Sequence, residues 1–195
     1  LHGLVMGPGA ELALSARGRI AAPGTRIAFP EVALGLCPEG GTTRRLARLV
    51  GTATALRLLL SGRAIGADEA LAIGLIDAIA ADPVTAARAA KLALLPDGEV
   101  PADPAAVAEA RRSQTGALPA AGRIIACVEA AALLPVEAHQ AFESVAREDL
   151  EATPEAAALR SAAWADRRVA ALPAGLAGVR AVVPDRIALH GASPD

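Results

Sequence analysis

The triplet Gly7-Pro8-Gly9 constrains the start of this chain, because it closes the short apolar run of residues 1–6 and directly precedes a segment with helical spacing. Proline has a fixed φ and no N–H donor, so it suits the first turn of a helix better than a strand. We therefore predict a strand, a tight turn and a helix start. The first N–H groups of a helix have no partner inside it and can hold a developing negative charge. An ordinary connection between a strand and a helix has the same pattern, so both interpretations stand.

Further glycine and proline residues divide the rest of the chain into short elements. Thr42 or Thr43 is suited to cap the helix that begins near Arg44, and Gly51 to end it. The stretch 96–104 has the composition of a linker. Strands are expected at 19–22, 26–29 and 75–79, and helices at 44–50, 53–60, 67–73, 81–94, 105–112, 120–134, 136–150 and 154–171.

The pattern therefore predicts an α/β fold, with strands within residues 1–79 and one further strand-like run at residues 186–189 in the tail. Apolar residues recur at helical spacing between residues 105 and 171, and they would be exposed if this segment stood alone. We expect the segment to be almost wholly helical and to pack partly on residues 1–80.

The composition excludes several classes of protein. With 53% apolar residues, 21% charged residues and a net charge of −2, the chain is neither disordered nor collagen-like. The arginines are dispersed along the sequence, so no concentrated positive field is available for nucleic acid or an anionic membrane, and we expect neither as a partner. No uninterrupted stretch of about 18 apolar residues exists, so a helix that spans a bilayer is not expected.

The two cysteines, Cys37 and Cys127, lie far apart in apolar surroundings, without a CxxC motif or a suitably spaced histidine. We interpret them as small buried side chains in a reducing cytoplasm, rather than as a disulfide or a metal site. No metal is expected. His139 has no partner at metal-ligand spacing and is interpreted as structural, and Trp164 as a packing anchor.

Two glutamates stand in positions that favour chemistry. Glu11 follows the Gly-Pro-Gly turn, Glu31 follows the strand-like piece that Phe29-Pro30 ends, and both are flanked by apolar residues. An apolar environment destabilises the charged carboxylate and raises its pKa, so that the group can donate and accept protons near neutral pH. Two such groups facing one substrate can position a water and return a proton. Either glutamate alone can equally be a helix-start or surface residue.

These residues carry a resemblance to a known family. The matching segments, in order, are HGLVMGPGAELALSA, RIAAPGTRIAFPEVALGLCPEGGTTRRLARLVG and LLLSGRAIGADEALAIGLIDAI. From residue 1 to about residue 80 the chain resembles the crotonase (enoyl-CoA hydratase/isomerase) family. The resemblance implies a spiral ββα fold, acyl-CoA thioester substrates, and Glu11 and Glu31 as the catalytic pair. The implied reaction is hydration of 2-trans-enoyl-CoA to 3-hydroxyacyl-CoA in fatty-acid β-oxidation, without a metal or redox cofactor.

The later helices are similar to the linker of multifunctional β-oxidation proteins, in which a 3-hydroxyacyl-CoA dehydrogenase follows the hydratase/isomerase module. This resemblance implies a C-terminal part of a crotonase-like core at 1–95, a helical extension or linker at 96–172, and a tail at 173–195 where a dehydrogenase domain would begin. The tail segment RIALHGASPD lacks a G-x-G-x-x-G turn, so no NAD site is expected in this chain. A dehydrogenase domain in a longer chain and a homo-oligomer are the protein partners considered.

The chain departs from the family at the turn of Gly7, Pro8 and Gly9. The resemblance places an oxyanion-stabilising N–H at the residue three before Glu11, and here that residue is Pro8, which has none. Losing one such donor typically costs about 100- to 1000-fold in rate, although Gly9 offers a neighbouring N–H. The chain also looks N-terminally truncated relative to the family. From the chain as given we therefore expect weak hydration or none.

Two alternatives to the hydratase follow from the resemblance. A non-catalytic acyl-CoA-binding or structural domain would keep the fold without the donor lost at Pro8. A double-bond isomerase would move a proton with Glu31 or Glu39 and exclude water. Glu39 is considered because some isomerases of the family carry a carboxylate eight residues after the second glutamate. Glu39 can equally be an exposed loop residue. Arg44 and Arg45 are interpreted as solvent-facing side chains rather than ligands of the CoA phosphates.

Overall fold

Five short strands form the framework of the first part of the chain, in a computed structural model that describes residues 1–90, 98–116 and 118–170. Strand β1 (Leu4–Met6) pairs in parallel with β3 (Arg26–Ala28), which pairs antiparallel with β4 (Ile65–Gly66). A second sheet joins β2 (Ile20–Ala21) and β5 (Ala78–Ile79) in parallel. The predicted strands are thus confirmed in order but are shorter than expected. The predicted tail at 173–195 lies outside the described residues.

Helices make up most of the remaining described residues, and proline starts many of them. Pro8, Pro83, Pro104 and Pro119 each stand in the first turn of a helix, where the missing N–H costs no hydrogen bond. The helices are α1 (Pro8–Ser15), the 3₁₀ helix η1 (Pro30–Leu34), α2 (Thr42–Val50), α3 (Thr52–Ser61), α4 (Ala67–Ala72), α5 (Pro83–Ala89), α6 (Pro104–Ser113), α7 (Pro119–Ala130), α8 (Val136–Glu151) and α9 (Pro154–Ala170).

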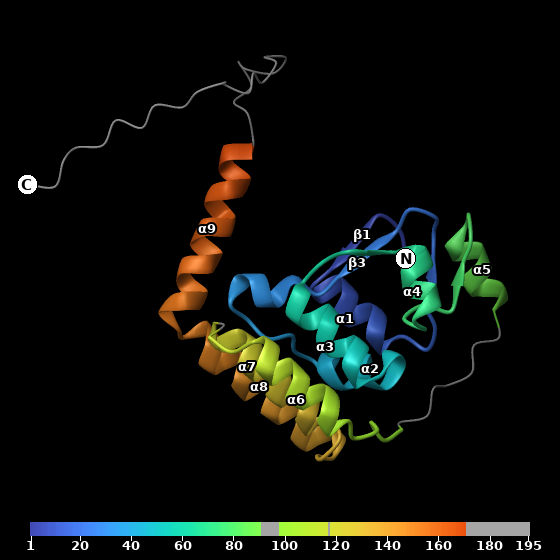
Figure 1. The fold of residues 1–195 in the computed structure, drawn as a ribbon. Coiled ribbons are helices and arrows are strands. Elements are labelled where there is room, and N and C mark those ends of the chain that lie inside the picture. Colours follow the sequence, from blue (N-terminus) through green and yellow to red (C-terminus); the bar gives the residue numbers. More distant parts are fainter. Residues whose placement is uncertain (91–97, 117, 171–195) are drawn as a thin grey trace, which may run out of the picture.

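The helices after residue 104 pack on the first part of the chain, as predicted. Helices α6 and α7 contact α3, and α7 also contacts α2. In Figure 1 the helices α6, α7 and α8 lie together on one side of α2 and α3, with the strands β1 and β3 beyond them. The side chains at this junction are almost fully buried; they include Leu46, Leu58, Leu59, Ile124, Ile125 and Val128.

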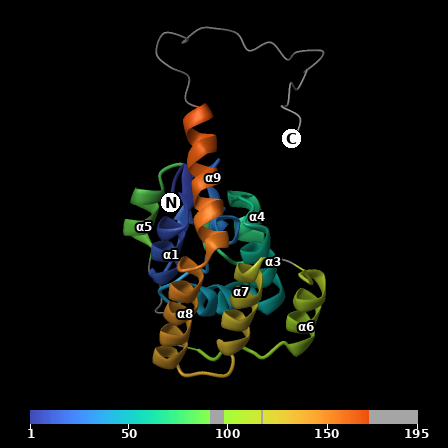
Figure 2. The same ribbon diagram turned by 90° about the vertical axis from the view of Figure 1, so that its left-hand side faces the viewer.

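Helix α9 contacts η1 and α8, and its far end extends beyond the body of the molecule in Figures 1 and 2. Its Ala156 is fully buried against Gly35, where an added Cβ would lie 2.8 Å from the Ala156 Cα atom. Trp164, further along the helix, is 68% exposed. The interpretation of Trp164 as a packing anchor is therefore wrong, because most of its surface remains exposed.

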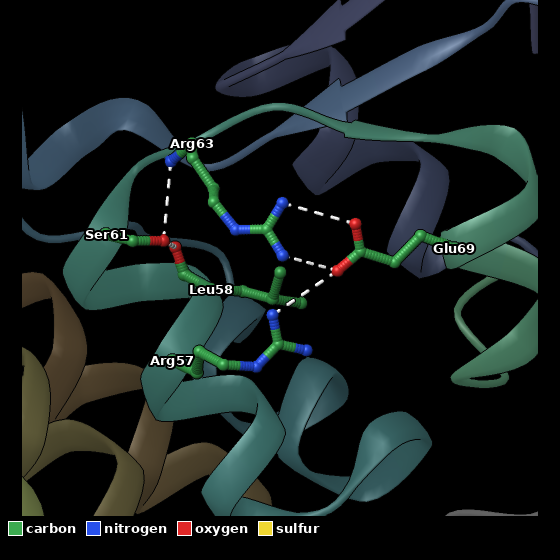
Figure 3. A network of polar contacts seen from close by, with 5 residues as sticks. All are labelled: Arg57, Leu58, Ser61, Arg63 and Glu69. Atoms are coloured by element: carbon green, nitrogen blue, oxygen red, sulfur yellow. Dashed lines mark hydrogen bonds and ion pairs between the residues drawn. The ribbon is translucent and has the colours of Figure 1, made fainter.

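An ion-pair network fastens α4 to the end of α3. Glu69 of α4 binds Arg63 through both carboxylate oxygens, at 2.5 and 3.2 Å, and accepts a third contact from Arg57 at 3.3 Å (Figure 3). These cations lower the pKa of Glu69. Because the network lies at the surface, it contributes little to stability.

The N-terminus of α2 is capped by a residue from another helix. The N-cap position is Gly41, and neither Thr42 nor Thr43 caps the helix with its side chain, which corrects the prediction. Instead the carboxylate of Glu143 on α8 accepts hydrogen bonds from the Gly41 N–H at 2.5 Å, the Thr43 N–H at 2.9 Å and the Thr43 hydroxyl at 2.7 Å. A carboxylate at this end of a helix is favoured by the free N–H groups and by the helix dipole.

A histidine completes this buried contact. The Nε2 atom of His139 lies 3.0 Å from the carbonyl oxygen of Cys127 and 3.2 Å from the Thr43 hydroxyl. Since a carbonyl only accepts, Nε2 carries the hydrogen. Both His139 and Glu143 are fully buried, so the structural interpretation of His139 is confirmed.

The two adjacent arginines of α2 differ from their predicted role. Arg44 is half-buried and donates to the carbonyl oxygens of Ala131 and Leu134, at 2.5 and 3.0 Å, beyond the end of α7. Arg45 donates to the carbonyl of Gly40. The interpretation of Arg44 as a solvent-facing side chain is therefore wrong, because its guanidinium satisfies carbonyls that the helix leaves free.

We expect Glu143→Ala to lower the free energy of unfolding by about 3–5 kcal/mol, because it leaves the buried donors of Gly41 and Thr43 without an acceptor. Glu143→Gln, which keeps one carbonyl oxygen, should cost about 1–3 kcal/mol. Urea unfolding followed by circular dichroism measures both. Glu148→Gln, exposed on the same helix, is the control and should stay within about 0.5 kcal/mol of the parent. An equal effect at Glu143 and Glu148 would contradict the capping role.

Candidate active site

The turn at Gly7 links the sheet, helix α1 and one candidate glutamate. Gly7 has φ +48°, which favours glycine, and its N–H donates to the Ala28 carbonyl at 3.3 Å, so that the β1–β3 pairing continues into the turn. A Cβ atom added to Gly7 would lie 3.1 Å from Oε1 of Glu31. The close approach of backbone and carboxylate therefore requires a residue without a side chain.

Proline at position 8 limits the donors that this turn offers. Pro8 is the first residue of α1, Gly7 already donates to Ala28, and the N–H of Glu11 donates to the Gly7 carbonyl at 2.9 Å. Gly9 is exposed and is the first residue after Pro8 with an N–H, and α1 contains no carbonyl four residues before it. Among the described residues at this turn, Gly9 is thus the exposed donor available for a developing anion.

Glu31 lies in a setting that holds a proton. It is the second residue of η1 and only 5% exposed, and its Oε2 has no hydrogen-bond partner among the described residues. Burial, together with the negative charge of Glu11, raises its pKa to about 7, against the opposing effects of a backbone hydrogen bond and of Arg147. Burial rules out the surface interpretation for Glu31.

Glu11 faces the same region from α1. It is half-buried, and its Oε1 accepts a hydrogen bond from the Glu39 N–H at 3.2 Å. Burial raises its pKa, the hydrogen bond from Glu39 opposes the rise, and the charges of Glu39 and Glu143 reinforce it. The charge of Glu11 also acts on Glu31, so the fold brings the two predicted glutamates within electrostatic range of each other.

Glu39 reaches this site through its backbone. Glu39 is exposed in the loop between η1 and α2, and its contact with Glu11 comes from its backbone N–H rather than from its carboxylate. The third candidate residue thus lies beside Glu11, and the observed contact is a hydrogen bond that holds the Glu11 carboxylate.

Sequence analysis missed Arg147, a residue of α8 whose positive charge lowers the pKa values of both Glu11 and Glu31. Its guanidinium donates to the Cys37 carbonyl at 3.0 Å and to Glu151 at 2.7 Å. The spacing of Arg147 and Glu151 predicts an ion pair along a helix, but it carries no information about a contact with a loop 110 residues away.

The two cysteines are buried and free, as predicted, but they are not separate. Their sulfur atoms lie 3.7 Å apart, between the loop before α2 and helix α7. The contact and burial raise the pKa of Cys37, which keeps the thiol protonated. Within residues 1–90, 98–116 and 118–170, no three His, Cys, Asp or Glu side chains form a group that could hold a metal ion. No helix in these ranges is long and apolar enough to cross a membrane.

Known proteins share a sequence pattern and a fold with this chain. A family model described as enoyl-CoA hydratase/isomerase matches residues 1–174. An enoyl-CoA hydratase/isomerase from Pseudoalteromonas atlantica T6c is similar over 84% of this chain and 59% of its own, with 23% identity and a TM-score of 0.56. An enoyl-CoA hydratase from Mycobacterium avium subsp. paratuberculosis K-10 is similar over 84% of this chain and 61% of its own, with 24% identity and a TM-score of 0.58. The chain thus spans about three fifths of the length of these structures.

The pKa of Glu31 predicts a pH-dependent stability. An unfolded glutamate titrates near 4.5 and the folded one near 7, so the folded state binds the additional proton between these values and loses stability as the pH rises through them. At about 1.4 kcal/mol for each pH unit, the loss is about 3 kcal/mol. Glu31→Gln removes this titration, so the variant should gain stability relative to the parent between pH 4.5 and pH 8.

Urea unfolding at several pH values measures the difference between parent and variant. The exposed Glu137→Gln is the control, and its difference from the parent should not follow this window. A Glu31→Gln difference that stays constant with pH would show that Glu31 is ionised normally.

Proposed function

The chain belongs to the enoyl-CoA hydratase/isomerase family, and from this premise we propose that it supplies a glutamate pair that hydrates 2-trans-enoyl-CoA to 3-hydroxyacyl-CoA. The fold prediction is confirmed, since the similar structures share the crotonase-like fold. The observation that carries the proposal is the setting of Glu31, a buried carboxyl group with a pKa of about 7 that lies against the glycine turn and within electrostatic range of Glu11.

The two glutamates differ in a way that divides the reaction between them. Glu11 is half-buried and is held by the Glu39 N–H, so it can accept a proton from water as the water oxygen bonds to C3 of the substrate. Glu31 holds a proton near neutral pH and can deliver it to C2. The C2–C3 double bond becomes single, and the two proton transfers leave the sum of charges unchanged. The N–H of Gly9 would stabilise the negative charge that develops on the thioester oxygen.

A second function is favoured by the donors of the turn. The N–H of Gly7 donates to the Ala28 carbonyl, and Pro8 has no N–H. The turn therefore lacks the donor that the resemblance places three residues before the first glutamate. With Gly9 as the sole exposed donor described at this turn, the domain could retain acyl-CoA affinity without turnover. The isomerase alternative through Glu39 remains a prediction, as do a role in β-oxidation, a cytoplasmic location, a dehydrogenase partner and a homo-oligomer.

If the glutamates act as proposed, Glu31→Gln and Glu11→Gln should each slow the hydration of crotonyl-CoA by at least about 100-fold, because each removes a general acid or base. Formation of 3-hydroxybutyryl-CoA, followed by chromatography over long incubations, detects even weak activity. Glu137→Gln, an exposed change in the first turn of α8, should leave the rate unchanged. Product formation that survives both glutamate changes would remove the paired-glutamate mechanism.

The role of the turn is tested by restoring a donor. Pro8→Gly should accelerate hydration by about 100- to 1000-fold, the range over which oxyanion donors act. Pro104→Gly is a matched control, because Pro104 is also an exposed first residue of a helix and lies outside the site. Acyl-CoA binding without turnover in both the parent and Pro8→Gly would favour the non-catalytic function instead.

A further inference from the structure

Helix α8 holds the loop that carries Glu39 from two points. Glu143 and Arg147 are four residues apart, so they lie on the same face of the helix, one turn from each other. Glu143 accepts the Gly41 N–H at 2.5 Å, and Arg147 donates to the Cys37 carbonyl at 3.0 Å. Glu143 therefore binds the free N–H at the Gly41 end of the loop, and Arg147 binds the free carbonyl at its Cys37 end.

Arg147 is itself held in place. Its Nε donates to Oε1 of Glu151 at 2.7 Å, one turn further along α8, and its side chain is only 22% exposed. Because the guanidinium is planar, a hydrogen bond from Nε to Glu151 also restricts the direction in which Nη1 points. Glu151 thus orients Arg147 toward the Cys37 carbonyl.

The loop passes this constraint to Glu11 over a short and stiff path. Only Pro38 separates Cys37 from Glu39; it is buried, and its ring fixes φ. Since φ of Pro38 is fixed, ψ of Pro38 is the one soft torsion between the peptide plane of the Cys37 carbonyl and that of the Glu39 N–H. Binding the Cys37 carbonyl therefore restricts the direction from which the Glu39 N–H reaches Oε1 of Glu11, at 3.2 Å. A shift of this loop would release the carboxylate of Glu11.

The geometry points to Arg147 as a positioning residue of the candidate site, which keeps the Glu39 N–H aimed at the Glu11 carboxylate by binding the Cys37 carbonyl. The role of Glu11 in hydration rests on the proposed function, but the contacts that position it do not. Arg147 makes no hydrogen bond with Glu11 or Glu31, so it acts on them through the loop and through its charge.

The positive charge of Arg147 also acts on the glutamates of the candidate site. Its charge lowers the pKa values of Glu11 and Glu31, while Glu151, Glu39 and Glu11 raise the pKa of Arg147 itself. Glu143 is a further acid that raises the pKa of Glu11. With this many acids and one central arginine, removal of the cation should raise the pKa values of Glu11 and Glu31.

The test compares Arg147→Met and Arg147→Lys with the parent, by amide hydrogen exchange and by NMR titration of the glutamate carboxyls. Exchange of the Glu39 amide should be at least about tenfold faster in Arg147→Met, as expected for loss of a charge-assisted hydrogen bond. The titrations of Glu11 and Glu31 should move to higher pH. Arg147→Lys keeps the charge but not the two directed bonds, so it should speed Glu39 exchange while leaving the titrations near those of the parent.

Two further variants keep the test decisive. Glu151→Gln weakens the orientation of Arg147 without removing it and should give a smaller increase in Glu39 exchange, even if Arg147→Met fails to fold. Arg123→Met removes an exposed arginine of α7 that pairs with Asp149 of α8, and it should change neither readout. Unchanged Glu39 exchange in folded Arg147→Met or Arg147→Lys and in Glu151→Gln, or equal changes in Arg123→Met, would overturn the proposal.

Turnover separates this inference from the proposed function. If exchange and titration respond but no variant forms 3-hydroxybutyryl-CoA, the positioning role stands and the hydratase function falls. If the parent hydrates crotonyl-CoA, Arg147→Lys should lower kcat at least about tenfold with KM within about twofold, because the loop positions the glutamate rather than the substrate. A rise in KM alone would instead assign Arg147 to substrate binding and would overturn the inference.

Discussion

The carboxylate of Glu143 is the contact on which the rest of this structure depends. It is fully buried and accepts three hydrogen bonds from Gly41 and Thr43, 100 to 102 residues earlier in the chain. Burying a carboxylate is costly, and a partly satisfied one is worse than an apolar residue, so the contact favours one alignment of α8 on α2 over its neighbours. Once this alignment is set, Arg147 lies opposite Cys37 and Ala156 lies opposite Gly35.

The candidate site depends on this alignment, but its own buried carboxyl group has fewer hydrogen-bond donors around it than Glu143 has. Glu31 is nearly as buried as Glu143, yet one of its oxygens has no partner among the described residues, and its neighbour Glu11 is also an acid. A carboxyl group in this position is poorly adapted for stability and well adapted for holding a proton. The same residue type thus serves as a cap in one place and as a candidate acid in another, because the number of donors around it differs.

Much of the fold and half of the site could be predicted because their signals are local. The positions of glycine and proline and the spacing of apolar residues predict the Gly-Pro-Gly turn, the order of the short strands and the late helices. The resemblance points to Glu11 and Glu31. Periodicity shows which face of α8 is apolar, but not that Glu143 and Arg147 on that helix meet a loop about a hundred residues away. The predictions of a threonine cap for α2 and of Trp164 as a packing anchor were wrong for this reason, since each depended on what a distant part of the chain places beside the residue.

The close packing of Ala156 on Gly35 bears on the order in which parts of the site can form during synthesis. The ribosome makes the loop of residues 35–41 long before the residues that hold it, which begin at Glu143 and end with Ala156. Strands β1 and β3 can pair early, but the acceptor for the Gly41 N–H, the donor for the Cys37 carbonyl and the residue that covers Gly35 emerge about a hundred residues later, within 14 positions of each other. The glutamates of a nascent chain would therefore approach one another well before the loop beside them acquires its final shape.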